Sequence, residues 1–165
     1  MSKNLFESFS LLGKQIWVVG GAGYLGQGIC KLLVQSGANV LCIDLLHKAD
    51  EFVGSFPEHE AQLTAATLDI RDGEAIKKFV RERTMSTAVP DGLVILTFGS
   101  TAKSFDNLTE KDFDEVNHTG LTSTFLLARE VGMCMAKKGK GSIVLFSSMY
   151  GSVSPDPEVY ESPMN

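Results

Sequence analysis

The chain alternates between short apolar runs and longer stretches in which apolar residues recur every three or four positions. Apolar runs of this length are typical of strands that are buried on both faces of a parallel sheet. The five runs cover residues 15–19, 39–43, 62–68, 92–97 and 142–146. The stretches with helical spacing cover residues 26–36, 47–56, 73–83 and 109–137. This alternation predicts βαβ units, and hence an α/β fold: a doubly wound, Rossmann-like parallel sheet with helices on both faces.

Particular residues mark where these helices begin and end. Gly37 follows the first helix as its C-terminal glycine, and Pro57 ends the second. Asp72 and Thr109 each precede a helix, and we expect both to cap free N–H groups there. The long helix is predicted to carry one apolar stripe, made of Phe113, Val116, Gly120, Leu121, Phe125, Ala128, Val131 and Met135.

Composition narrows the class of protein without changing this fold. A chain of 165 residues, 44% of them apolar and 21% charged, suits a single domain over residues 1–165. The net charge of −5 gives no indication of the basic surface that binds nucleic acid or an anionic membrane. No stretch resembles a membrane span or a signal peptide, so we expect a cytoplasmic protein. Cys30, Cys42 and Cys134 lie far apart, which argues against a disulfide framework and against a metal site.

The segment after the first strand carries the first candidate chemistry, because doubly wound sheets bind ligands beyond the carboxyl ends of their strands. Gly20, Gly23 and Gly26 stand between the first strand and the first helix, a context that favours dinucleotide binding. Small residues let the backbone approach a pyrophosphate. Tyr24 and Leu25, just before the predicted helix, are further cofactor-binding candidates, and the start of the helix offers free N–H groups to the phosphates. The alternative is a tight turn that binds nothing.

Asp44, at the end of the second strand, indicates which dinucleotide this turn binds. A carboxylate at this point can accept hydrogen bonds from both ribose hydroxyls, and it repels a 2′-phosphate. No arginine follows Asp44 directly, and Lys48 is the nearest lysine after it. The position therefore favours NAD over NADP. The alternative is an aspartate that caps the next helix.

With these motifs the chain resembles the short-chain dehydrogenases/reductases over nearly its whole length. The resemblance implies that Asp69 and Ile70, after the third strand, contact the adenine ring of the cofactor. After the fourth strand the family usually has Asn-Ala-Gly, whereas this chain has Thr97, Phe98 and Gly99. Only Gly99 carries over as a cofactor-binding residue. Phe98 places a bulky ring beside the cofactor groove.

The same resemblance assigns two catalytic residues. Asn117, on the long helix, matches the asparagine that organises water in the family's proton relay. Ser148, after the fifth strand, matches the serine that holds the oxygen of the substrate carbonyl or alcohol. From the residues alone, the alternative for Asn117 is a structural polar contact. The alternative for Ser148 is a serine that opens a loop.

The family's acid/base, a tyrosine with a lysine four residues later, has no counterpart in the sequence. Ser154 stands four positions after Tyr150, and Met164 stands four positions after Tyr160. We therefore expect the Tyr-x-x-x-Lys pair to lie beyond residue 165 and the chain to be incomplete at its C-terminal end. The apolar fifth strand favours the same interpretation, since it would otherwise be an exposed edge. Alternatively, a partner chain covers that edge.

Together these features predict an NAD(P)-dependent oxidoreductase that interconverts an alcohol and a ketone, with NAD as the cofactor. A sugar or sugar-derived molecule is the candidate substrate, and the 165 residues alone should be inactive. The resemblance also implies a homodimer or homotetramer formed through the long helix. The alternative is a catalytically silent NAD-binding module or scaffold. A sugar-nucleotide epimerase is a third possibility, which only the glycine spacing favours.

Overall fold

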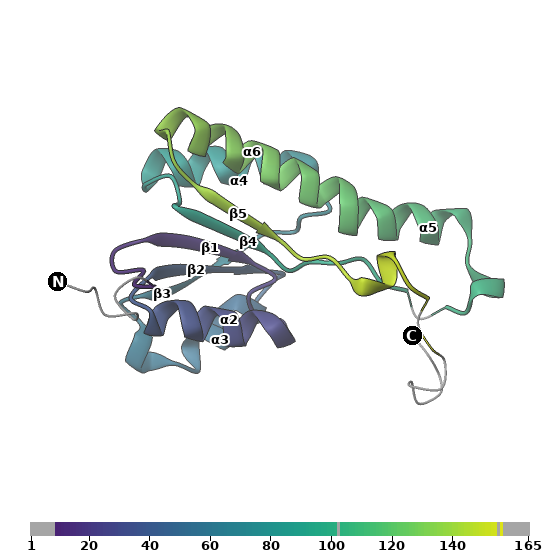
Figure 1. Cartoon of the computed structure of the whole chain (residues 1–165), viewed down its shortest axis with the longest axis horizontal. Helices are drawn as coiled ribbons and strands as arrows, with labels where there is room; N and C mark the ends of the chain where they lie inside the picture. Colours follow the sequence, from purple (N-terminus) through teal and green to yellow (C-terminus); the bar gives the residue numbers. More distant parts are fainter. Residues whose placement is uncertain (1–8, 102, 155, 157–165) are drawn as a thin grey trace.

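Five parallel strands form one sheet in the computed structural model, which describes residues 9–101, 103–154 and 156 (Figure 1). The strands are β1 (Gln15–Val19), β2 (Asn39–Asp44), β3 (Leu63–Thr67), β4 (Gly92–Ile95) and β5 (Ser142–Leu145). Their order is β3-β2-β1-β4-β5, so the strand order reverses between β1 and β4. The fold class and the five strands predicted from the sequence are confirmed, with strand ends that differ by at most two residues.

Helices cover both faces of the sheet, with α2 and α3 on one face and α4 and α6 on the other (Figure 1). The helices are α2 (Tyr24–Gln35), α3 (Lys48–Gly54), α4 (Gly73–Ser86), α5 (Glu110–Asn117) and α6 (Ser123–Lys138). Single turns are η1 (Pro57–His59), η2 (Phe105–Asn107), η3 (His118–Thr122) and η4 (Met149–Gly151). As predicted, the Asp72 side chain caps α4: it accepts hydrogen bonds from the N–H groups of Glu74 and Ala75, at 2.9 and 3.1 Å.

The central strand β1 shows how the sheet separates two apolar layers. Ile16 and Val18 belong to the layer that α2 and α3 cover, and Trp17 and Val19 belong to the layer beneath α4 and α6. All four side chains are at most 7% exposed. β1 is therefore buried on both faces, as its unbroken apolar run predicts.

The long helix is interrupted, which the sequence pattern does not predict. α5 ends at Asn117, the π-helical turn η3 follows, and α6 continues to Lys138. A π turn holds an extra residue, so it rotates the faces of the two α-helical parts relative to each other. The predicted stripe is therefore not one buried face: Phe113, Leu121 and Phe125 are 65%, 69% and 59% exposed. The buried residues of α6 are Ser123, Leu127, Val131 and Met135.

β5 is the outer strand of the sheet, because within the described chain only β4 pairs with it. The expectation that an uncovered fifth strand forms an exposed apolar edge is confirmed. The exposed fractions lie between 36% and 53% for Ile143, Val144, Leu145 and the adjacent Phe146.

The turn from β1 to α2 brings two backbone segments unusually close. A Cβ atom on Gly26 would lie 2.2 Å from the carbonyl oxygen of Gly20 and 2.7 Å from backbone atoms of Gly21. Gly20 itself has a φ of +79°, a conformation that side chains disfavour. The N–H of Gly23 donates to the Gly20 carbonyl at 3.2 Å and closes the turn. The first residues of α2 are thereby fixed against the end of β1.

Asp91 joins three elements at the opposite, amino ends of the strands. Its carboxylate accepts hydrogen bonds from the backbone N–H of Gln15 at 3.1 Å and from Lys138 Nζ at 2.9 Å. Lys140 Nζ lies 3.7 Å from the same carboxylate. The side chain is only 17% exposed, and the Gln15 amide and the Lys138 ammonium hold the pKa of Asp91 below its ordinary value. Asp91 therefore ties the start of β1 and the end of α6 to the residue before β4.

Gly26→Ala should lower the free energy of unfolding by more than about 1 kcal/mol, because backbone atoms must move to admit the methyl group. Gly28→Ala is the matched control in the same helix, since nothing lies within 4 Å of its added Cβ. Its higher helix propensity should stabilise the protein by up to about 1 kcal/mol. Urea unfolding measures both changes. Equal stabilities of the two variants would contradict the close approach at Gly26.

Asp91→Asn should cost about 1–3 kcal/mol of unfolding free energy at pH 7, because hydrogen bonds to a charged carboxylate are lost. The folded state lowers this pKa, so the carboxylate's contribution is complete above the unfolded-state value of about 4. It is lost as the pH falls through the lower folded-state value. The difference between wild type and variant, followed by urea unfolding against pH, should therefore shrink in acid. Asp106→Asn, in the exposed turn η2, should show little effect at either pH.

Candidate functional site

A cleft of about 1160 Å³ lies across the carboxyl ends of the strands. The segments that follow β1, β2, β3 and β4 form one side of it, and residues of α5 and η3 complete it. Its position at the reversal of strand order is where sheets of this kind bind ligands. Of the candidate site residues predicted from the sequence, the cleft is lined by Gly20, Gly23, Asp44, Asp69, Ile70, Gly99 and Asn117. Those that do not line it are Tyr24, Leu25, Gly26 and Ser148.

The glycine turn contributes backbone rather than side chains to the cleft. No side chain caps the start of α2, where Gly23 is the residue before the helix. Tyr24 and Leu25 are 98% and 57% exposed, whereas Gly26 is buried beneath the turn. Gly26 therefore shapes the turn, and uncapped N–H groups at the helix start are available to an anion.

Asp44 lies on the wall of the cleft next to this turn. One of its carboxylate oxygens accepts a hydrogen bond from the N–H of Ala22 at 3.0 Å, and the other accepts from Leu45 at 2.8 Å. Each oxygen retains an acceptor position, because a carboxylate has about four. The residue before α3 is His47, so Asp44 does not cap that helix. Of the two interpretations of Asp44, ribose binding and helix capping, the structure excludes helix capping.

The segment after β3 places Asp69 at the cleft and turns Ile70 mostly into the core. Ile70 is 6% exposed and packs in the apolar layer beneath α4 and α6. Asp69 forms an ion pair with Arg71, with 2.6 Å between Oδ2 and Nη2. Hydrogen bonding from Arg71 holds the pKa of Asp69 below its ordinary value. The sequence analysis did not anticipate Arg71, which also lines the cleft.

The loop after β4 packs tightly against the helix opposite. A Cβ on Gly99 would lie 2.3 Å from the carbonyl oxygen of Val116, so only glycine permits this approach. Phe98 lines the cleft and is 77% exposed, as expected for a ring beside the groove. The hydroxyl of Thr97 is buried and has no hydrogen-bond partner among the described residues.

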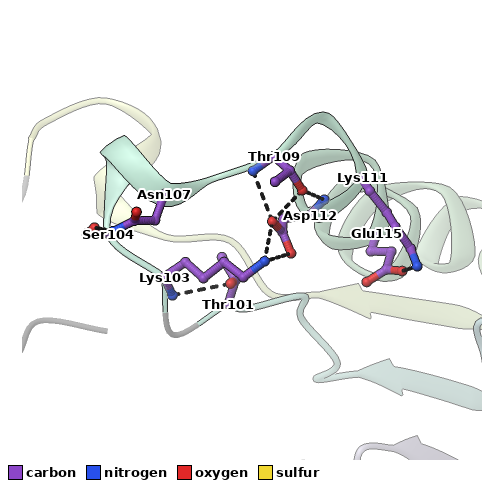
Figure 2. Close-up of polar contacts among 8 residues, drawn as sticks. All are labelled: Thr101, Lys103, Ser104, Asn107, Thr109, Lys111, Asp112 and Glu115. Carbon is purple, nitrogen blue, oxygen red and sulfur yellow. Dashed lines mark hydrogen bonds and ion pairs between the residues drawn. The ribbon is translucent and has the colours of Figure 1, made fainter.

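A second contact fastens the same loop further along, as Figure 2 shows. Lys103 Nζ donates to both carboxylate oxygens of Asp112, at 2.8 and 2.6 Å. Asp112 also accepts from the N–H of Thr109 at 2.9 Å, and its own N–H donates to the Thr109 hydroxyl at 3.2 Å. Lys103 and Thr109 hold the pKa of Asp112 far below its ordinary value. The predicted cap at Thr109 is confirmed. The Thr-x-x-Asp spacing could have revealed Asp112, whereas nothing in the sequence pairs it with Lys103.

Asn117 stands where α5 gives way to the π turn η3, on the wall of the cleft. Its Nδ2 donates to the carbonyl of Phe113 at 2.9 Å, which leaves its side-chain oxygen to accept a hydrogen bond. The next residue, His118, reaches across to the segment after β3: its Nε2 lies 2.8 Å from the carbonyl oxygen of Arg71. Interruptions of this kind occur frequently at functional sites.

Ser148 is exposed at the carboxyl end of β5, and its hydroxyl accepts a hydrogen bond from the N–H of Tyr150 at 3.1 Å. It thereby caps η4, which is the structural alternative considered for this serine. Tyr150 lies within η4 and is 44% exposed. Tyr160 lies outside the described residues.

No three His, Cys, Asp or Glu side chains in the described part of the chain are grouped so that they could hold a metal ion. Cys30 and Cys42 are buried and Cys134 is half-buried, and all three are free thiols. Within the same residues, no helix combines the length and the apolar character needed to cross a membrane.

Comparison with known proteins gives consistent results. The family model for short chain dehydrogenase matches residues 14–160. The chain is 29% identical to 2-dehydro-3-deoxy-D-gluconate 5-dehydrogenase of Bacillus subtilis, over 88% of this chain and 57% of that protein. It is 24% identical to NAD-dependent glycerol dehydrogenase of Listeria innocua, over 95% of this chain and 61% of that protein.

Among solved structures, a short chain dehydrogenase from Leptospira borgpetersenii with bound NAD+ matches with a TM-score of 0.78 and 25% identity. That match covers 97% of this chain and 60% of the other. The chain thus spans little more than half the length of the curated relatives it matches. Its sheet order, its cleft and the family match over residues 14–160 agree, and the chain belongs to the short chain dehydrogenase family.

Proposed function

We propose that the full-length protein is an oxidoreductase that interconverts an alcohol and a ketone, with NAD as its cofactor. The observation that carries this proposal is the cleft, which brings the glycine turn, Asp44 and Asn117 to one edge of the sheet. The family of the chain supports the reaction class. The proposal concerns the full-length protein, because the chain spans only part of the length of its relatives.

The residues of the cleft fit a dinucleotide. The backbone of Gly20 and Gly23 borders the cleft beside the uncapped start of α2, which would hold the pyrophosphate. Asp44 would accept hydrogen bonds from the ribose hydroxyls with the acceptor positions that Ala22 and Leu45 leave. Gly99 and Asn117 would lie toward the nicotinamide end. Bound NAD supplies the acceptor for the hydride that leaves the alcohol carbon.

We propose that Asn117 holds a water molecule of the proton relay and that Ser148 donates a hydrogen bond to the substrate oxygen. The free side-chain oxygen of Asn117 can hold a water molecule at the cleft wall. The Ser148 hydroxyl accepts from Tyr150, so its own hydrogen remains available to a substrate oxygen. A base must also take the proton of the alcohol. We propose that a Tyr-x-x-x-Lys pair outside the 165 residues supplies it, so these residues alone should show no turnover.

A sugar-derived or related polyol substrate is proposed from the relatives. Their names include a dehydrogenase of 2-dehydro-3-deoxy-D-gluconate, a glycerol dehydrogenase and a sorbose reductase. All three names denote small molecules with several hydroxyl groups. We also propose that the protein is located in the cytoplasm.

We further propose assembly into a homodimer or homotetramer through α5 and α6. Phe113 on α5, Leu121 in the intervening turn η3 and Phe125 on α6 are large apolar side chains, and each is more than half exposed. The guanidinium of Arg129 lies 5.5 Å from the centre of the Phe125 ring, as a cation over an aromatic face. An exposed apolar surface on two consecutive helical segments favours contact with a second copy.

A silent NAD-binding module is the second candidate, and the contact at Ser148 is the observation that favours it. The hydroxyl of Ser148 caps η4, and the residue does not line the cleft. Binding of NAD by the full-length protein, without oxidation of any polyol or sugar alcohol, would support this alternative.

The full-length protein should bind NAD at least about tenfold more tightly than NADP, because Asp44 repels a 2′-phosphate. Asp44→Asn removes the negative charge and should reduce this ratio. Asp50→Asn, on an exposed position of α3 outside the cleft, should leave the ratio unchanged. Calorimetric titration with both cofactors measures all three proteins. Equal affinities in the wild type would contradict the role of Asp44.

Ser148→Ala in the full-length protein should reduce kcat/KM by roughly 10²-fold or more, because the substrate oxygen loses its hydrogen-bond donor in the transition state. Ser147→Ala is the matched control, since Ser147 is the adjacent exposed serine. Steady-state kinetics with a range of sugar alcohols tests both variants. The assignment of Ser148 fails if the two variants keep the same activity as the wild type.

A further inference from the structure

Asn117 lies where the long helix changes its hydrogen-bond pattern, and its direction depends on that change. The N–H of Ser123 donates to the carbonyl of His118, five residues back, which is the hydrogen bond of a π turn. Such turns are rare, since α-helical pairing competes with them. If η3 returned to α-helical pairing, the end of α5 would face a different direction. The position of Asn117 at the cleft therefore requires contacts that hold η3 in place.

Backbone packing holds this turn on the side of β4. A Cβ on Gly99 would lie 2.3 Å from the carbonyl oxygen of Val116, and a Cβ on Gly120 would lie 3.3 Å from the backbone nitrogen of Gly99. The two glycines let the loop after β4 lie directly against the backbone on either side of Asn117. Close packing of this kind prevents movement of the turn toward the loop, but not movement away from it.

His118 supplies a directional contact to another part of the chain, the segment after β3. Its Nε2 lies 2.8 Å from the carbonyl oxygen of Arg71, and because a carbonyl can only accept, Nε2 carries the proton. Among the described residues, this is the one hydrogen bond that joins a side chain of η3 to another segment. The acceptor is itself held in place: the N–H of Arg71 donates to Asp69 at 3.0 Å, and Asp72 caps α4 directly after it.

We propose that His118 is a positioning residue for Asn117. Its hydrogen bond to the Arg71 carbonyl holds the π turn in place and so keeps the Asn117 side chain at the cleft. This inference rests on the proposed function, in which Asn117 holds a water molecule. His118 also lines the cleft, but its contribution to turnover is made through Asn117. That contribution should therefore disappear in a protein that has already lost Asn117.

The test compares variants of the full-length protein in steady-state kinetics with the sugar alcohol that the wild type oxidises fastest. His118→Leu removes the donor and should lower kcat by about five- to tenfold, the factor that corresponds to one hydrogen bond. The KM for the alcohol and the Kd for NAD should stay within about twofold of the wild type. His118→Gln, whose side-chain amide can donate to the same carbonyl, should recover most of kcat.

A double-mutant cycle separates positioning from a general disturbance of the cleft. Asn117→Ala should lower kcat, and adding His118→Leu to it should cause no further loss, because residues that act as a unit are not additive. Amide hydrogen exchange gives a readout that does not depend on turnover. Exchange in residues 118–123 should be several-fold faster in His118→Leu and unchanged in His118→Gln.

His59→Leu, in η1 and outside the cleft, is the matched control and should reproduce the wild type in kinetics and in exchange. The inference is overturned if His118→Leu keeps the wild-type kcat, or if it lowers kcat by the same factor with and without Asn117. A loss of NAD affinity in parallel with kcat would also overturn it. In these cases the wild type still oxidises the alcohol, and the proposed function stands. If the wild type oxidises no sugar alcohol, the proposed function fails and the inference fails with it.

Discussion

The close approach of Gly26 to the Gly20 carbonyl is the constraint on which the rest of the site depends. With 2.2 Å between that oxygen and the position of an added Cβ, α2 can begin directly at the end of β1 only if residue 26 has no side chain. The N–H groups at the start of α2 then face the same edge of the sheet as Asp44. Because the strands are parallel, the segments after β3 and β4 reach this edge as well, and one cleft collects them all.

The sequence predicted the fold well because its strongest signals are local. Residues 16–19 form an apolar run without polar interruption, which is typical of a strand covered on both faces. Asp72 and Thr109 are caps whose side chains bond N–H groups two or three residues away, so spacing alone identifies them. The apolar stripe of the long helix was less informative, because an exposed apolar face and a buried one look alike in sequence.

The parts of the site that sequence did not predict depend on contacts between distant segments. Lys103 and Asp112 lie nine residues apart with a loop between them, and no pattern of spacing pairs them. Arg71 forms hydrogen bonds with the Asp69 carboxylate through the local geometry of the segment after β3, and the family resemblance singled out Asp69 without this arginine. Ser148 was placed correctly at the end of β5. Its hydrogen bond with Tyr150 follows from the shape of η4, which the sequence did not indicate.

The π turn η3 has a consequence for how relatives of this chain can vary in length. It lets Asn117 face the cleft while Leu127 faces the core, although both belong to one continuous run of helical residues. A π turn is equivalent to a one-residue insertion in an α-helix. Deleting a residue between Asn117 and Leu127 would turn α6 by about 100° relative to α5, since an α-helix has about 3.6 residues per turn. The number of residues between Asn117 and Leu127 is therefore constrained. A deletion between them would move either Asn117 away from the cleft or Leu127 out of the core.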